Sequence, residues 1–481
     1  MDIAKVQASK YRFFTVGAIG TFMATLDGSI LNVALPSIAK DLDAPVQLVA
    51  WVVLAYSLTM ISLLLAFGVW TERRGYRFAY RFGYIFFLAG SILCACSTGI
   101  YVLIASRVMQ AMGTAMFAAV GPGMVTTVFP SEERGKGLGI MVMMVSAGFM
   151  VGPPLGGFIL GQWSWHVIFL INIPVGIFGL FWIHKYFGML PPPRNPRRLR
   201  LASPMSASLS IVSGVFALTL LDDFPLTDPR LWGLGLLSLT SFITFLKLES
   251  IPQKALIGLG ILRNRQFTTS LGAQLTHFCG LSGVTVLLPF YLERVRHLTA
   301  QQVGMYLVIL PIMMFLVAPN AGRLSDKIGF RLLTAGGTAT IAIGLYLLSG
   351  VTLVTESWYI VACLVVVGGG VGMFSTPNAS AFMGSVSQKQ RAISSGILAT
   401  NRNIGMSTGV ALSTTLFAYL QMQNIGLGGE ELVFIESFRP VVCVAAGFAL
   451  LSSVFCLIRS NRSRSHDDGS YVLTDRPFNS G

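Results

Sequence analysis

The chain has 481 residues, of which 53% are hydrophobic and only 11% are charged. Soluble proteins carry about 25% charged residues, so this chain cannot cover a globule of its size with ionised groups, and an ordinary soluble enzyme is excluded. The same composition excludes a disordered, collagen-like or coiled-coil chain. A mean hydropathy of +0.69 and 51 glycines are instead typical of apolar helices packed in lipid.

Apolar stretches long enough to cross a bilayer, which takes about 20 helical residues, recur along the chain. There are fourteen, centred on residues 14–38, 46–70, 79–97, 101–128, 137–161, 165–187, 205–221, 231–248, 267–291, 300–321, 332–353, 357–382, 394–420 and 440–458. None shows the period-2 alternation of barrel strands, so helices are predicted. The expected fold class is an all-α polytopic membrane protein.

Lysine and arginine indicate how these helices are oriented. If residue 1 is cytoplasmic, most of the basic residues fall on the cytoplasmic side, as the positive-inside rule requires. We therefore expect a multi-pass protein of the inner (cytoplasmic) cell membrane with both termini in the cytoplasm. The pI of about 9.7 then reflects topology and contact with anionic lipid headgroups, not nucleic acid. The first apolar run exceeds a signal-peptide core, so we expect it to be retained.

One loop motif occurs twice. The segments GVWTERRGYR and GRLSDKIGFR both place an acid four residues after a glycine, then a base, a second glycine and an arginine. The matching residues are Gly68, Glu72, Arg73, Gly75 and Arg77 in the first copy and Gly322, Asp326, Lys327, Gly329 and Arg331 in the second. Both copies fall on the cytoplasmic side, where we interpret them as a latch that holds that side closed; a solvated charge run is the alternative. Repeated membrane halves are typical of secondary transporters.

The repeat also sets the domain organisation. Six helices in residues 1–190 form one bundle and six in residues 266–459 form another, with a basic linker, two inserted helices and a cytoplasmic loop in residues 191–265. Residues 460–481 are predicted to be a disordered cytoplasmic tail. The motif copies are equivalent only when the inserted pair is left out, so we expect that pair outside the transport core. Asp222, Asp223 and Asp228 then lie in its outer loop.

Charged residues inside predicted helices are the candidates for function. Asp27 is the only acid well inside a predicted helix, and Arg107 and Arg402 are the embedded bases. An embedded charge costs about 2.5 to 3.5 kcal/mol on insertion scales. A carboxylate that is alternately dry and wet, or near to and far from a cation, can bind a proton on one side and release it on the other. Asp27 is thus the predicted proton carrier, with Arg107 tuning it; a permanent structural ion pair is the alternative.

Five stretches in order resemble the major facilitator superfamily, in its 14-helix branch of drug:proton antiporters. They are LDGSILNVALP (Leu26–Pro36), the loop motif, RVMQAMGTA (Arg107–Ala115), GFMVGPPLGG (Gly148–Gly157) and WSWHVIFLINIPVG (Trp163–Gly176). The chain departs from the family pattern at Ser29, Trp70, Glu72, Tyr76, Ala111 and His166. The resemblance implies two six-helix bundles with two extra helices between them. It further implies proton-driven multidrug efflux, with Arg107 tied to proton transfer.

Further site residues follow from spacing and position. Glycines four apart let helix backbones approach closely and prolines interrupt the hydrogen-bond ladder, so Gly148, Gly152, Pro153, Pro154, Gly156 and Gly157 are predicted to form a gating seam. The predicted substrate cavity contains Asn32, Gln110, Gln274 and Arg402. Arg402 is equally compatible with a purely structural pairing.

The sequence contains no phosphate-binding loop, nucleophile elbow or paired catalytic carboxylates. We therefore expect a transporter driven by a proton gradient, not an enzyme, and expect no cofactor and no metal. Its expected partners are protons, an amphipathic small molecule and anionic lipids; we expect a monomer, and an adaptor protein is compatible with the sequence. One alternative is an exporter of a specific endogenous metabolite, lipid or siderophore-like molecule. A transporter-like ligand sensor or channel is an alternative of another class.

Overall fold

The computed structural model describes residues 10–129, 134–187, 202–220, 228–251, 259–386, 391–426 and 428–459. Within these ranges the chain is helical and contains no strand. The predicted all-α fold class is confirmed. Thirteen described helical spans are long and apolar enough to cross a membrane. The remaining predicted crossing is the more polar helix α16, which has 34 residues (Arg391–Asn424).

The first bundle is made of α2 (Lys10–Asp41), α3 (Val46–Arg74), α4 (Tyr76–Ala95), α5 (Ile100–Val128), α6 (Arg134–Leu160), α7 (Val167–Leu170) and α8 (Asn172–Tyr186). The inserted pair is α9 (Ala202–Thr219) and α10 (Pro229–Ser250), followed by the short 3-10 helix η3 (Leu259–Arg263). In the first bundle, one membrane-crossing span is divided near its start into the two helices α7 and α8.

The second bundle is made of α11 (Arg265–Phe290), the π-helical turn η4 (Tyr291–Val295), α12 (Ala300–Leu307), α13 (Ile309–Ile328), α14 (Phe330–Leu348), α15 (Ser357–Gly384), α16 and α17 (Glu430–Ile458). Here too one membrane-crossing span is divided into two helices, α12 and α13. The last helix begins about ten residues before the predicted 440, because its first turns, with Glu430, Glu431 and Glu436, are too polar to be counted as apolar sequence.

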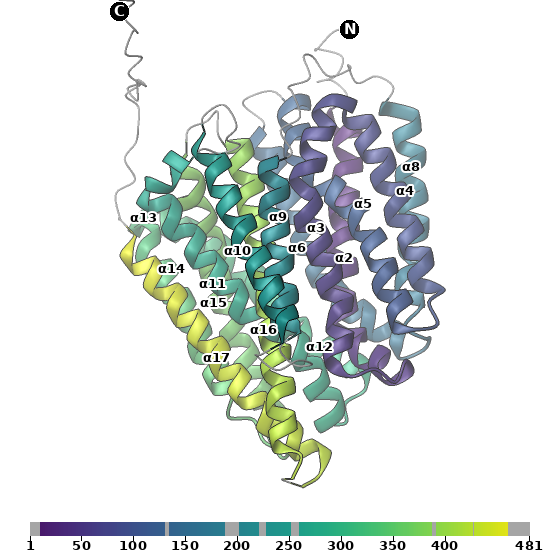
Figure 1. Ribbon diagram of the computed structural model, residues 1–481, viewed down its shortest axis with the longest axis vertical. Helices are drawn as coiled ribbons and strands as arrows, with labels where there is room; N and C mark the ends of the chain where they lie inside the picture. Colours follow the sequence, from purple (N-terminus) through teal and green to yellow (C-terminus); the bar gives the residue numbers. More distant parts are fainter. Residues whose placement is uncertain are drawn as a thin grey trace, which may run out of the picture.

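The two bundles lie side by side, with the inserted pair in front of them in the view of Figure 1. We call the side where α2 begins at Lys10 and α17 ends at Ile458 the terminal face. The other side, where α2 ends at Asp41 and α17 begins at Glu430, is the opposite face. These terms describe the protein before any orientation in a membrane is assigned.

The sequence repeat is also a repeat of backbone geometry. Gly75 separates α3 from α4 with φ 85° and ψ 164°, and Gly329 separates α13 from α14 with φ 84° and ψ 159°. Each glycine donates its N–H to the preceding turn, Gly75 to Thr71 O at 2.8 Å and Gly329 to Ser325 O at 2.9 Å. Helix pairs repeat as well, since α2 packs on α6 as α11 packs on α16.

The hydrophobic cores show where the bundles meet. One large cluster contains residues of both bundles, such as Val49 of α3, Leu287 of α11 and Phe417 of α16. The clusters nearer the terminal face stay within one bundle: one includes Phe13 and Phe187, and another Phe267 and Phe382. The bundles therefore share a core toward the opposite face and have separate cores toward the terminal face.

The inserted helices differ from each other in position. Among the described elements α10 packs mainly on α9, whereas α9 packs on α3 of the first bundle and on α16 of the second. Hydroxyl groups make these contacts: Ser208 Oγ donates to Ser62 O at 3.1 Å, and Thr415 Oγ1 donates to Leu218 O at 3.2 Å. Helix α9 thus covers the junction of the bundles and α10 lies outside it, while the placement of the pair outside the transport core stays a prediction.

Of the acids expected in the outer loop of this pair, Asp222 and Asp223 lie outside the described residues. Asp228 is the N-cap of α10, where its Oδ1 accepts a hydrogen bond from the backbone N–H of Arg230 at 2.8 Å. This is a structural role typical of an aspartate at a helix N-terminus.

The two glycines of the first loop motif should respond differently to alanine. Gly75→Ala should lower the melting temperature in detergent, because its φ and ψ are adopted almost only by glycine and cost other residues about 1 to 3 kcal/mol. Gly68→Ala is the matched control, since it lies inside α3 and a Cβ there meets nothing within 4 Å. Equal melting temperatures for both variants would contradict the conformational argument.

Candidate functional site

The centre of the site is a buried ion pair in the first bundle. Asp27 of α2 and Arg107 of α5 are each only 1% exposed, and Arg107 Nη1 lies 2.5 Å from Asp27 Oδ2. A hydrogen bond between two ionised groups is stronger than a neutral one. Two of the three embedded charges predicted from the sequence, Asp27 and Arg107, are therefore in direct contact.

The second oxygen of the carboxylate has uncharged partners. Asp27 Oδ1 accepts hydrogen bonds from Gln110 Nε2 at 2.8 Å and from Asn172 Nδ2 at 2.9 Å. Gln110 Nε2 also donates to Ser91 Oγ of α4 at 2.9 Å, which connects α4 to the network around Asp27. Asp27 is thus held by side chains from α5 and α8, with α4 behind them, and both carboxylate oxygens are satisfied.

The guanidinium is held as firmly as the carboxylate. Arg107 Nε donates to Val52 O at 3.3 Å, and Nη1 also contacts Gln110 Oε1. The guanidinium carbon lies 4.1 Å from the centre of the Tyr56 ring, a cation–π geometry. Tyr56 is fixed in turn by a 2.6 Å hydrogen bond between its hydroxyl and Thr114 Oγ1. The network therefore extends to α3.

This burial constrains what a proton can do at Asp27. The ionised pair is neutral overall, but protonating Asp27 in place would leave the guanidinium of Arg107 as a buried, uncompensated cation. Breaking a buried ion pair in this way costs about 3 to 5 kcal/mol. Proton binding at Asp27 consequently favours any rearrangement that gives Arg107 another partner or water. A permanent structural pair would use the same contacts, so the geometry alone leaves that alternative open.

The residues predicted to line the substrate cavity differ in their burial and in their neighbours. Gln110 is fully buried in the network around Asp27, whereas Asn32, on α2, is half-buried. Sequence reasoning missed Asn172, Ser91 and Tyr56 as members of the network. The available signal was strongest for Asn172, a single amide in the otherwise apolar stretch VIFLINIPVG.

The glycines of α6 lie directly against the helix that carries Asp27. A Cβ on Gly148 would lie 2.8 Å from Thr25 Cβ, and one on Gly152 would meet the Ser29 side chain and lie 3.1 Å from Ile30 N. Ser29 Oγ donates to Gly148 O at 2.9 Å across the same contact. This is the close packing that the four-residue spacing predicts.

Another face of α6 contacts the second bundle. A Cβ on Gly157 would lie 2.8 Å from Ala300 O, and one on Gly304 would collide with Pro153 O. Both contacts join α6 to α12 toward the opposite face. Helix α6 therefore connects the Asp27 helix with the contact between the bundles, and Gly156 and Pro154 lie in the same stretch of it.

The second bundle has a different polar set. Asn401 Nδ2 of α16 donates to Gln274 Oε1 and to Leu271 O of α11, both at 3.0 Å. Arg402 is half-buried beside this pair and forms no ion pair within the described part of the chain. Helix α11, the counterpart of α2, contains no acid. Of the two residues predicted here as cavity residues, Gln274 is thus bonded to α16 through Asn401, and Arg402 follows Asn401 in the chain.

The loop motifs can be traced only in part. The side chains of Glu72, Arg73 and Asp326 lie outside the described residues, while Arg77 and Lys327 are exposed at the terminal face. Gly322 lies inside α13, where a Cβ would meet Thr376 Cγ2 at 3.2 Å, and Arg331 is half-buried in the first turn of α14. The latch interpretation therefore remains a prediction.

Comparison with known proteins decides the family. Residues 17–410 match the Major Facilitator Superfamily. The chain belongs to this superfamily. Its members are transporters, so the chain is a multi-pass membrane transport protein and not an enzyme. The resemblance identified from the five motifs is confirmed.

Several relatives within the superfamily cover most of the chain. The riboflavin transporter RibZ of Clostridioides difficile is 32% identical over 459 residues, which are 95% of this chain and 99% of that protein. The uncharacterised transporter YebQ of Escherichia coli is 31% identical, with 85% and 90% covered. The multidrug resistance protein Stp of Mycobacterium tuberculosis is 28% identical, with 84% and 75% covered.

Solved structures show the same fold at low sequence identity. A bacterial homologue of the human lysosomal transporter Spinster, in an inward-facing and unoccupied conformation, superposes with a TM-score of 0.67 at 15% identity, covering 93% of this chain and 96% of that one. A peptide transporter POT in complex with sulfate gives a TM-score of 0.68 at 16% identity, covering 95% and 97%.

The seam between α6 and α2 gives a testable prediction. Gly152→Leu should block transport or make vesicles leak protons, because the added side chain collides with Ser29 and forces the two backbones apart. Gly447→Leu is the control, since Gly447 lies in α17 and a Cβ there meets nothing within 4 Å. Wild-type transport and wild-type proton leak in the Gly152 variant would show that this contact is not a working seam.

Proposed function

We propose that this chain is a proton-coupled exporter of amphipathic small molecules that works by alternating access, with Asp27 as the proton-binding group. The observation that carries the proposal is the buried pair of Asp27 and Arg107, joined by Gln110 and Asn172. A fixed charge pair at this depth is expensive. A cycle that protonates Asp27 and releases Arg107 would explain why the protein contains this energetically costly pair.

The charge distribution supports an orientation with the terminal face in the cytoplasm. Described basic residues at that face include Lys10, Arg12, Arg74, Arg77, Lys185, Lys247, Arg263, Arg265, Arg323, Lys327 and Arg331. Acids gather at the opposite face, where they include Asp41, Asp43, Asp228, Glu356, Glu430 and Glu431. Cytoplasmic loops of membrane proteins are rich in lysine and arginine, so we place both ends of the described chain in the cytoplasm of a cell membrane.

The positions of the shared and separate cores support an inward-facing state. The bundles share one core toward the opposite face, and α6 contacts α12 there through Gly157 and Gly304. With the terminal face cytoplasmic, this contact closes the outer side. Export then requires the outer contact to open while the two inner cores come together, a motion of one repeat against the other.

The polar set of the second bundle favours uncharged or anionic substrate groups. Arg402 supplies a cation without a partner in the described chain, and Gln274 and Asn401 supply amides. Asp27, the embedded acid of the first bundle, is already paired with Arg107. The polar set of Gln274, Asn401 and Arg402 contains no acid, so a substrate cation would find no carboxylate there, whereas a carbonyl, hydroxyl or carboxylate group could bind the amides and Arg402.

A second candidate is a transporter for one specific metabolite, such as a flavin. The similarity to the riboflavin transporter RibZ, which extends over 95% of this chain, favours it. Riboflavin is uncharged and rich in hydrogen-bonding groups, which suits Gln274, Asn401 and Arg402. The relatives named as multidrug resistance proteins favour the broader substrate range. Substrate-dependent proton flux over a panel that includes riboflavin, ethidium and Nile red separates the two candidates.

Asp27→Asn should abolish proton-driven transport while the protein still inserts and folds. The amide resembles the protonated acid in shape and can still accept the hydrogen bonds of Gln110 or Asn172, but it cannot exchange a proton. The measurement is substrate accumulation in proteoliposomes under an imposed pH difference, over the panel above, with downhill exchange of the same substrate as a second readout.

The matched control is Asp41→Asn, at the other end of the same helix, where Oδ2 accepts from Trp165 Nε1 at 2.8 Å. We expect this control to keep pH-driven accumulation. A variant with Asn at position 27 that still concentrates substrate against its gradient would refute Asp27 as the proton carrier and leave the ion pair a structural element. Residual downhill exchange would agree with the proposal.

A further inference from the structure

A cavity of about 540 Å³ lies between the inserted helices and α16. We call it the seam cavity. Its walls are apolar residues and small hydroxyl-bearing residues from three helices, among them Ala207 and Ser210 of α9, Ser238 of α10, and Thr400 and Asn401 of α16. A volume of this size is typical of sites for drug-sized ligands.

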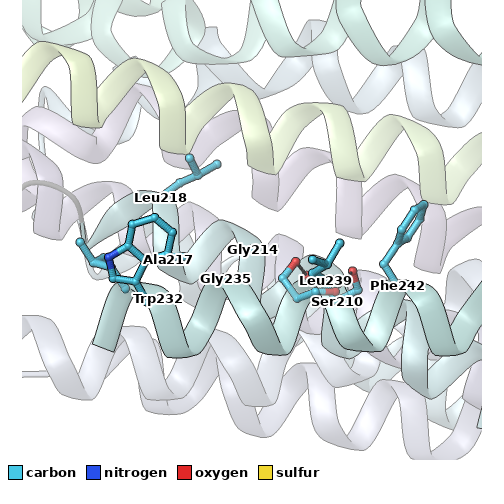
Figure 2. A pocket seen from close by; sticks show the side chains of 10 residues that line it. Ser210, Gly214, Ala217, Leu218, Trp232, Gly235, Leu239 and Phe242 are labelled. Atoms are coloured by element: carbon cyan, nitrogen blue, oxygen red, sulfur yellow. Dashed lines mark hydrogen bonds between the residues drawn. The ribbon is translucent and has the colours of Figure 1, made fainter. Parts of the chain in front are cut away.

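A second cavity of about 450 Å³ shares part of this lining, and Figure 2 shows the side chains that border it. Ser210, Gly214 and Ser238 border both cavities. Reciprocal hydrogen bonds fix this common wall, with Ser210 Oγ donating to Ser238 O at 2.9 Å and Ser238 Oγ donating to Ser210 O at 2.8 Å. The short side chains hold α9 and α10 together at this point and leave space on either side.

The seam cavity lies at the junction of the two transport bundles. Helix α9 is fixed to α3 by the Ser208–Ser62 hydrogen bond and by the rings of Trp51 and Phe216, whose centroids are 5.3 Å apart. It reaches α16 near the opposite face through Leu218. Nearer the terminal face, the cavity separates α9 from residues 397–408 of α16.

The lining chemistry specifies the class of ligand. None of the lining residues is ionised at neutral pH. Thr400 Oγ1 is buried and has no hydrogen-bond partner, a state that costs about 1 to 3 kcal/mol. Next to it, Asn401 contributes to the wall and donates to Gln274 of α11. The cavity therefore offers an apolar volume with an amide link to the polar set of the second bundle, and the unsatisfied Thr400 hydroxyl lies just behind its wall, where a turn of that side chain would bring it to a ligand.

We propose that the seam cavity binds an uncharged amphipathic molecule that arrives from the lipid leaflet at the terminal face, with its apolar body between α9, α10 and α16 and a hydroxyl or carbonyl group that bonds the Thr400 hydroxyl once that side chain turns toward the cavity. The inference rests on the proposed function for the role of this ligand as transported substrate. An acyl chain would fill the volume but would leave the Thr400 hydroxyl without a partner. A permanently charged molecule would find no counter-ion among the lining residues.

The test measures binding directly and needs no transport. The full-length protein in nanodiscs is photolabelled with a diazirine-bearing benzyl alcohol or, in a separate arm, with phosphatidylcholine that carries a diazirine in one acyl chain. Labelled peptides are identified by mass spectrometry. Ala207→Phe fills the seam cavity, whereas the matched variant Ala217→Phe fills only the adjoining cavity, which Ala217 lines without bordering the seam cavity. Thr400→Val removes the hydroxyl at nearly constant volume.

We expect the alcohol probe to label α9 and α16 peptides of the seam cavity, with that labelling lost in Ala207→Phe and retained in Ala217→Phe. Thr400→Val should raise the half-saturating probe concentration by roughly three- to tenfold, as for one lost hydrogen bond. No labelling of these peptides in the wild-type protein, or labelling that is unchanged in Ala207→Phe and Thr400→Val, would overturn the proposal. So would lipid labelling of the same peptides that the alcohol cannot displace, which would identify a lipid site. Because no proton gradient is applied, failure here is distinct from failure of the Asp27 experiment.

Discussion

The structure depends on the burial of one carboxylate beside one guanidinium. Asp27 and Arg107 are almost completely shielded from solvent, so each needs the other and each needs hydrogen bonds on its remaining atoms. Gln110 and Asn172 satisfy the carboxylate, and Val52 O and Tyr56 satisfy the guanidinium. These partners come from different helices, which fixes how the helices of the first bundle sit around α2.

The two halves share a backbone plan but divide the chemistry between them. The glycine pair Gly75 and Gly329 adopts nearly the same φ and ψ, and the close glycine contact of α6 on α2 has a counterpart where Gly409 of α16 lies against Cys279 of α11. Among the described residues, only the first half contains a buried acid–base pair. The second half has amides and an arginine instead, so the proposed function assigns proton binding and substrate binding to different bundles.

Sequence alone predicted the features with a large energetic cost. Membrane helices follow from hydropathy, and Asp27 and Arg107 stand out because an embedded charge is expensive. Gly75 and Gly329 stand out because the motif repeats. Asn172 and Ser91 did not, since an uncharged polar side chain in a membrane helix costs little and is common. Only the fold shows that Asn172 donates to Asp27 and that Ser91 accepts from Asn172 behind it.

The place of α9 also required the structure. Its contacts with α3 and α16 use hydroxyl groups and backbone carbonyls, such as Ser208 with Ser62 O, and these have no signature in a hydropathy pattern. The repeat separates the inserted pair from the two six-helix halves in sequence. It does not reveal that one helix of the pair lies across the junction of the halves, because the repeated motif says nothing about which helices pack on the outer surface of the two halves.

This position of α9 links the inserted pair to the transport cycle. Serine and ring contacts hold α9 to α3 along the first bundle, while its contact with the second bundle is made at Leu218, near the face where the bundles already share a core. If the inner cores of the bundles come together as proposed, α9 moves with α3 and the distance from α9 to residues 397–408 of α16 must change. The seam cavity lies in this interval, so its volume depends on the conformational state. A ligand bound there would favour the state in which the cavity is open. An inserted helix pair can thereby bias alternating access without contributing a charged residue to it.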